Sequence, residues 1–218
     1  MLIFLLVTLG VGSTLVSCAP YDTPVFAGAS EASDPSGDAM FLADDGPILA
    51  EDVGLKPTDD AGDLVSVSLL AEADRLLVTF RSAGDLGAAN QLGGGLWRGP
   101  RQLVEIDWSL TLRKGSRMWL VSAVTIEGWQ ATVSDSTGGS TTLEDEPSLD
   151  ETHKDRLLVP VPLSDLAGLE PPFEWFAISY WTIGGEKYLD EYSIFIDAVP
   201  GTRPDQSGYA QEWLSFPQ

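Results

Sequence analysis

Residues 103–112 read LVEIDWSLTL, a run in which apolar and polar side chains alternate from Val104 to Leu112. Ile106, Trp108 and Leu110 fall on one set of positions, and Asp107 and Ser109 fall on the other. Successive side chains of a β-strand point to opposite faces of its sheet. The period of two therefore predicts a strand with one buried face and one solvent face.

Other segments of the chain show similar strand patterns. Apolar or alternating runs cover residues 64–69, 76–80, 118–126, 129–133, 157–161, 173–183 and 188–196. The run 118–126 is apolar on both faces, which favours a central strand, whereas Pro160 and Pro162 favour an edge position for 157–161. Only residues 164–168 suggest a short helical turn, and no segment sustains a helical period. The pattern predicts an all-β fold, a single antiparallel β-sandwich of the jelly-roll or immunoglobulin-like kind.

Length and charge limit the function classes. The chain has 218 residues and a net charge of −21, from 33 acidic and 12 basic residues. This length suits one domain. The negative field repels nucleic acid, so we expect no nucleic-acid partner. The excess of acidic residues has two possible explanations, solubility in high salt or the concentration of cations at the surface, and both stay open.

The N-terminus resembles a bacterial lipoprotein signal peptide. Residues 2–16 are uncharged and largely apolar, and they are too few to span a membrane comfortably. Leu15-Val16-Ser17-Cys18 then resembles a lipobox. The resemblance implies cleavage before Cys18, the only cysteine, and attachment of acyl chains to it. Signal peptides normally start with a positive region, yet no Lys or Arg precedes Lys56, so a start upstream of Met1 stays open.

These features predict four parts of the chain: a signal peptide over 1–17, a lipidated cysteine and tether over 18–33, a β-sandwich over 34–205 and a C-terminal tail over 206–218. We expect an exported protein, held by its lipid on the outer membrane of a Gram-negative cell or otherwise on the outer face of the cell membrane. One acyl chain binds a membrane only marginally, whereas two or more bind it stably.

Short motifs in the domain resemble one group of exported β-sandwiches. They are Asp34-Pro35-Ser36-Gly37-Asp38, the strands 63–68 and 75–80, and Asp197-Ala198-Val199-Pro200. Together they resemble the family-9 carbohydrate-binding-module-like and DOMON-like domains, over about residues 34–205. The resemblance implies a binding domain whose relatives take sugars or haem and sometimes structural calcium.

Catalytic chemistry finds little support in the residue types. His153, the only histidine, lies in an acidic stretch beside Lys154, whereas a catalytic triad requires a buried and oriented His. No phosphate-binding loop or dinucleotide-binding glycine motif is present in the sequence. We therefore expect no enzyme and no catalytic residues.

A structural calcium ion is the one cofactor that the sequence suggests, and none is required. Asp34, Asp38, Asp63 and Asp197 lie near the two ends of the predicted sandwich, where chain ends often meet. Carboxylate oxygens are the ligands that calcium prefers. The alternative is that these side chains cap turns by hydrogen bonds to the backbone.

The pair Gly184-Gly185 predicts a tight hairpin turn. A two-residue turn would place Trp181 opposite Tyr188, and Trp181, Tyr188, Asp190 and Tyr192 on one face. We predict that these four residues form an exposed sugar-binding strip. A slip of one residue in the register would exchange the faces.

The sequence therefore predicts a membrane-anchored exported lipoprotein of the cell envelope that acts as a non-catalytic binding module, with carbohydrate as the first choice of ligand. The alternative is a structural or protein-interaction lipoprotein that has no small-molecule ligand.

Overall fold

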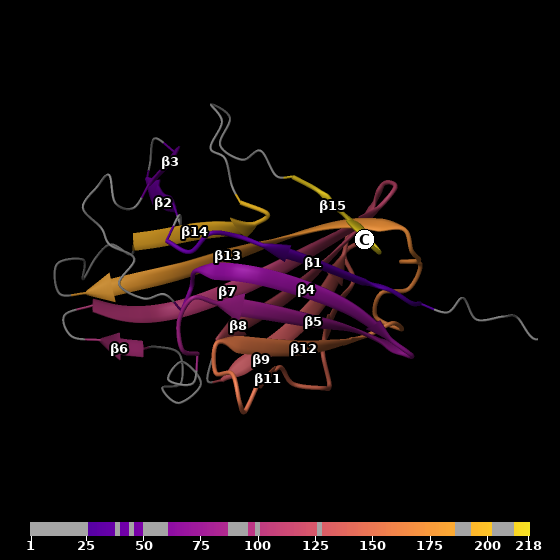
Figure 1. Ribbon diagram of the computed structural model, residues 1–218, viewed down its shortest axis with the longest axis horizontal. Helices are drawn as coiled ribbons and strands as arrows, with labels where there is room; N and C mark the ends of the chain where they lie inside the picture. Colours follow the sequence, from indigo (N-terminus) through magenta and orange to yellow (C-terminus); the bar gives the residue numbers. More distant parts are fainter. Residues whose placement is uncertain are drawn as a thin grey trace, which may run out of the picture.

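The protein folds as two antiparallel β-sheets packed face to face, a β-sandwich (Figure 1). The computed structural model describes residues 26–37, 40–43, 46–49, 61–86, 96–98, 101–125, 128–185, 193–201 and 212–218. The predicted all-β sandwich is confirmed. No helix in the described ranges is long and apolar enough to cross a membrane.

Five strands form the small sheet. Their order across the sheet is β1 (Ala29–Ser33), β4 (Leu64–Glu72), β5 (Arg75–Ser82), β12 (Arg156–Pro162) and β11 (Ser148–Leu149). The two-residue β11 pairs only with Leu157 and Leu158, so both prolines of β12 lie beyond the part that β11 covers. This position suits residues that have no N–H to donate.

Ten strands form the large sheet. Eight of them follow the order β10 (Ser140–Thr142), β9 (Trp129–Asp135), β8 (Arg117–Thr125), β7 (Arg101–Lys114), β13 (Phe173–Gly185), β14 (Ser193–Val199), β2 (Met40–Ala43) and β3 (Gly46–Leu49). Of the remaining two, β6 (Leu96–Arg98) pairs with β7, and β15 (Leu214–Phe216) pairs with β13. The decisive run 103–112 lies within β7, at the middle of this sheet.

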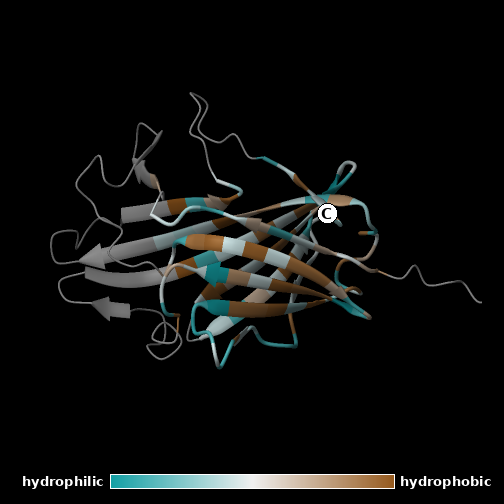
Figure 2. Cartoon of the chain, viewed as in Figure 1, coloured by the Kyte–Doolittle hydropathy of each residue, from teal (hydrophilic) through white to brown (hydrophobic). Residues whose placement is uncertain are grey.

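The core lies between the sheets and is rich in tryptophan. Trp108 of β7 packs 5.5 Å from Phe80 of the small sheet and 5.2 Å from Trp129 of β9, between ring centroids. The inward side chains of β4, β5 and β12 meet this layer, and Figure 2 shows the alternation of hydropathy along β4 and β5. A second, smaller cluster lies on the opposite face of β13 and β14, formed by Met40, Phe176, Ile178, Ile196 and Ala198 with Trp213 packed against it.

The predicted hairpin is wrong in its turn and its register. Gly184 and Gly185 pair with Gln102 and Arg101 of β7, so they continue a strand. β13 and β14 do pair as antiparallel neighbours, but Trp181 lies opposite Phe195. A long partner strand on the other side of β13 holds the two glycines extended, and this contact is invisible in the local sequence.

Two segments that we predicted to lie outside the sandwich are part of it. Ala29–Ser33, assigned to the tether, pairs with β4 as β1, and Phe26 before it is buried. Leu214–Phe216, assigned to the tail, pairs with β13 as β15. The predicted helical turn at 164–168 is a series of turns, with Leu166 N–H donating to the Leu163 carbonyl.

Candidate functional site

Hydroxyl side chains cover the outer face of three neighbouring strands of the large sheet. The strand registers place these residues on one face, because Ser109 of β7 lies opposite Ser122 of β8, and Ser122 opposite Thr132 of β9. We call this surface the hydroxyl face; it comprises Asp107, Ser109, Thr111, Ser122, Gln130, Thr132 and Ser134. Asp107 is its one ionisable side chain.

Asp107 organises the centre of the hydroxyl face. Its Oδ1 atom accepts hydrogen bonds from Ser122 Oγ at 2.7 Å and from Ser109 Oγ at 3.1 Å. Because both hydroxyl protons point at the carboxylate, the half-buried Ser122 presents its oxygen lone pairs to an incoming ligand. Ser109 is buried, and its hydroxyl orients the carboxylate. The cluster is therefore an array of acceptors, suited to a ligand that donates hydrogen bonds.

Tyr180 adjoins this array. It lies opposite Asp107 in the β13–β7 register and is 37% exposed. Val124 and Gln130 continue the same row across β8 and β9. The row spans three interstrand spacings, about 14 Å. It combines an aromatic ring with hydrogen-bonding groups on one surface.

The same side of β8 also carries apolar surface. Met118 is 45% exposed and Leu120 is 39% exposed. The strand is apolar on both faces, as predicted, but one of these faces is partly exposed. β8 is central in the sheet as predicted, with Trp119 and Val121 buried against the small sheet. Its outer face is exposed at Met118 and Leu120 and half-buried at Ser122 and Val124.

The predicted aromatic strip cannot include Trp181. Trp181 is 1% exposed and belongs to the core between the sheets, together with Trp175 and Ala177. The prediction that this face of β13 is exposed is wrong, because the true register turns it inward. The hydroxyl of Ser179 on this buried face donates to the carbonyl of Gly62. The other members of the strip, Tyr188, Asp190 and Tyr192, lie outside the described residues.

Three of the four predicted calcium ligands converge near the start of β4. Asp63 Oδ2 accepts from Gly37 N–H at 2.7 Å, Asp197 Oδ2 accepts from Leu64 N–H at 2.8 Å, and Asp34 N–H donates to the Val65 carbonyl. Asp34, Asp63 and Asp197 are buried, whereas Asp38 lies outside the described residues.

The hydrogen bonds that Asp63 and Asp197 accept favour the turn-capping alternative over calcium. Asp63 and Asp197 tie separate segments of chain together through backbone N–H groups, which satisfies donors that would otherwise be buried. Within the described ranges, no three His, Cys, Asp or Glu side chains are arranged to hold a metal ion.

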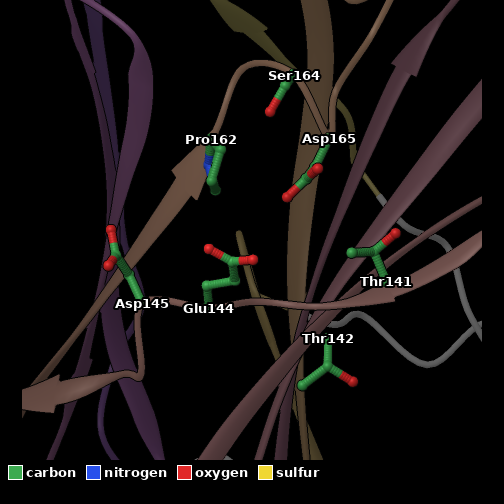
Figure 3. Close-up of a pocket in the computed structure, with 7 residues that line it drawn as sticks. All are labelled: Thr141, Thr142, Glu144, Asp145, Pro162, Ser164 and Asp165. Atoms are coloured by element: carbon green, nitrogen blue, oxygen red, sulfur yellow. The ribbon is translucent and has the colours of Figure 1, made fainter.

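An acidic hollow lies beside the β4–β5 turn, because Pro162 in its lining pairs with Arg75 at the start of β5. It has a volume of about 390 Å³ and is lined by Thr141, Thr142, Glu144, Asp145, Pro162, Ser164 and Asp165. Figure 3 shows the carboxylates of Glu144 and Asp165 pointing toward each other across it, whereas Asp145 lies to one side. Asp145 pairs with Arg75 at 3.5 Å. The hollow is open and polar, and its charge favours cations.

His153 has an exposed side chain, as the acidic stretch predicted. Its Nδ1 lies 3.3 Å from Asp150 Oδ2. The Asp150 carboxylate accepts hydrogen bonds from the backbone N–H groups of Thr152 and His153, and these bonds lower the pKa of Asp150. The pair is part of a surface turn. Cys18 and the signal peptide lie outside the described residues.

No protein-family profile, curated protein or solved structure matches this chain. The resemblance to sugar-binding and DOMON-like sandwiches therefore stays a prediction, and the residues themselves carry the functional argument. Sequence reasoning placed Asp107 and Ser109 on a polar face but did not single them out. Nothing in the sequence marks Tyr180 as exposed, because it shares its strand face with the apolar Phe176 and Ile178.

Proposed function

We propose that this chain is an exported lipoprotein, anchored in the cell envelope through Cys18, whose sandwich is a non-catalytic binding module for carbohydrate. The binding surface in this proposal is the hydroxyl face with Tyr180. It replaces the strip around Trp181, which is buried.

The observation that carries the proposal is the acceptor cluster at Asp107. Sugar hydroxyls are strong donors, and the half-buried Asp107 carboxylate and Ser122 oxygen can accept such bonds, while the buried Ser109 hydroxyl orients the carboxylate. The exposed Tyr180 ring beside them suits the apolar face of a sugar ring. The charge of −21 disfavours polyanionic glycans, so the ligand is an uncharged or basic glycan.

Glycan-array binding by the detergent-purified protein tests the proposal. Asp107→Asn should weaken binding about tenfold or more, since hydrogen bonds to a charged group contribute about 1.5–3 kcal/mol. Tyr180→Ala should weaken it about fivefold. Asp165→Asn, in the acidic hollow, is the matched control and should leave binding unchanged. A blank array, or equal binding by all variants, would reject the site.

The anchor has its own test. Replacing Cys18 by Ser removes the only sulfur that can carry the acyl chains, so the protein should leave the membrane fraction or remain unprocessed. Fractionation and intact-protein mass spectrometry measure both results. An unmodified Cys18 in membrane-bound parent protein would contradict the anchor.

A protein-interaction lipoprotein is the second candidate, favoured by the exposed Leu120 on the same side of the large sheet. Exposed apolar surface commonly marks a docking site. A blank glycan array, together with in-cell cross-links to an envelope protein that Leu120→Ser abolishes, would make this the better account.

A further inference from the structure

The strand β10 forms one edge of the large sheet, and β9 is its only neighbour among the described strands. Gly139, just before β10, accepts a backbone hydrogen bond from β9, and Leu143, just after β10, donates one to β9. Residues that bond to a given neighbour alternate along an antiparallel strand. Ser140 and Thr142 therefore direct their backbone N–H and C=O groups away from β9, where a further strand could pair with them.

Other edges of the sandwich are covered or contain proline. Beside β1 of the small sheet, Gln218 N–H donates to the Ala29 carbonyl. Pro160 and Pro162 lie in β12, next to the two-residue β11, and Pro47 lies in β3 at the other end of the large sheet. Proline and charged side chains are common means of blocking a sheet edge. β10 has the sequence Ser-Thr-Thr and contains neither, so its sequence leaves the edge available for pairing.

The acidic hollow lies on the inner side of β10. Thr141 is paired with Val133, which is buried between the sheets, so both side chains point toward the small sheet. Pro162, at the end of β12 in that sheet, lines the same hollow. Its volume of about 390 Å³ falls within the range of ligand pockets, about 300–1,000 Å³. On a strand added to β10, the residue opposite Thr141 would share this face and project into the hollow.

Two carboxylates of the hollow have no cation beside them. Asp145 pairs with Arg75 at 3.5 Å, whereas no basic side chain in the described part of the chain pairs with Glu144 or Asp165. The carboxylates of Glu144 and Asp165 point toward each other across the hollow (Figure 3). A lysine ammonium has three N–H donors and an arginine guanidinium has five, so either group can bond to both carboxylates at once.

We propose that the free edge of β10 is a docking site for an extended basic segment of a partner protein, which adds an antiparallel strand to the large sheet and places a Lys or Arg side chain in the acidic hollow. Ser140 and Thr142 supply the backbone pairing, and the hollow selects the side chain, a division of roles typical of strand addition.

Charge identifies the occupant of this edge. The chain carries a net charge of −21, so a second copy would bring more carboxylates to Glu144 and Asp165 and would be repelled. A basic segment is attracted by the same field. Because β10 has only three residues, backbone pairing alone binds weakly, and the charged contact in the hollow must add to it. The site is separate from the hydroxyl face, which lies on the outer side of the sheet.

Fluorescence anisotropy of a labelled peptide tests the docking site in the detergent-purified protein. The probe is TVTKTVT, whose alternation matches a strand with lysine at its centre, and TVTETVT is the matched peptide. The lysine peptide should bind at least about tenfold more tightly, because its ammonium donates charge-assisted hydrogen bonds. Asp165→Asn and Glu144→Gln should each weaken its binding severalfold. Glu146→Gln, an exposed carboxylate outside the lining, is the control and should leave binding unchanged.

Strand pairing has a separate measurement. Thr142→Pro removes an N–H that the added strand needs but that β9 does not use, so this variant should bind the lysine peptide about tenfold more weakly with an unchanged circular dichroism spectrum. N-methylation of the two threonines that flank the lysine, which would lie opposite Ser140 and Thr142, should weaken binding equally without altering the protein. The amides of Ser140 and Thr142 should also exchange hydrogen more slowly when the peptide is bound.

Two results would overturn the proposal. Equal binding of the lysine and glutamate peptides, or no binding of either, would remove the acidic hollow from the site. Binding of the lysine peptide that survives both Thr142→Pro and N-methylation, with no added protection of Ser140 and Thr142, would reject strand addition. Asp107→Asn, on the outer side of the sheet, should leave peptide binding unchanged, so sugar binding and strand addition can fail independently.

Discussion

Gly62 shows how closely a single position can be determined by packing. A Cβ atom built on Gly62 would lie 2.3 Å from Cδ2 of Trp181, far inside van der Waals contact. The Ser179 hydroxyl also donates to the Gly62 carbonyl, which holds this segment against β13. The indole therefore packs flat on the backbone, and no side chain can be accommodated between them.

Gly62→Ala should destabilise the protein by about 1–3 kcal/mol, because the added methyl group must displace a buried ring. Trp181→Ala should cost about 3–5 kcal/mol through the cavity that it leaves. Urea unfolding measures both. Gly139→Ala is the control, since its Cβ would meet only Asp135 at an ordinary 3.5 Å. An unchanged midpoint for Gly62→Ala would refute the close packing.

The β9–β10 turn is built around one carboxylate. Asp135 Oδ1 accepts from Thr137 Oγ1 at 2.6 Å, from Thr137 N–H at 2.8 Å and from Gly139 N–H at 3.2 Å. The side-chain bond from Thr137, followed by its backbone bond, lowers the pKa of Asp135 below the ordinary value of 3.8. The carboxylate is therefore stabilised in its charged form.

Thr137→Val removes the largest cause of that shift and should raise the pKa of Asp135. A lowered folded pKa contributes stability above the unfolded pKa, and this contribution is lost as the pH falls through the folded value. The variant should therefore be less stable than the parent at neutral pH, and the difference should disappear in acid. Carboxyl NMR titration and urea unfolding at both pH values measure this, with Thr141→Val as the control. A difference that persists below the Asp135 titration would contradict the linkage.

β13 shows why a strand is easier to predict than its faces. The largely apolar run over 173–183 predicted the strand, and both of its faces carry large apolar side chains. Trp175 and Trp181 face the small sheet, whereas Phe176 and Ile178 belong to the second cluster on the other face. Hydropathy alone cannot choose between two faces that are both covered. The choice comes from β7 and β14, distant segments that set the register.

For the whole molecule too, features that depend on local sequence could be predicted, whereas features that depend on long-range strand pairing could not. The sandwich class follows from a period of two in many short runs, which is local information. The assignment of β1 and β15 to the sandwich depends on pairing across the full length of the chain. The acceptor cluster of the candidate site also needs the β7–β8 register, because Ser122 reaches Asp107 only across strands. Residue types indicate such a site only once the pairing is known.

β15 joins the two sheets at the end of the sandwich where Phe26 and Gln218, the first and last described residues, lie. It pairs with β13 of the large sheet, while the Ser215 carbonyl accepts from Ser30 Oγ of β1 in the small sheet at 3.2 Å. The buried Phe216 stacks on Phe173 at 4.5 Å between ring centroids. The last residues of the chain therefore close one edge of the sandwich.

Phe216→Ala should cost about 3–5 kcal/mol in the free energy of unfolding, because a fully buried ring is removed from both sheets at once. Ser215→Ala is the matched control. Its side chain is exposed and only its carbonyl is used, so its unfolding midpoint should equal that of the parent. Urea unfolding and hydrogen exchange of the β1 amides measure the two effects. The opposite outcome would be an unfolding midpoint of Phe216→Ala equal to that of the parent, with unchanged hydrogen-exchange protection of the β1 amides. In that case β15 does not stabilise the sandwich, and the packing of Phe26 on Phe173 alone must close this edge.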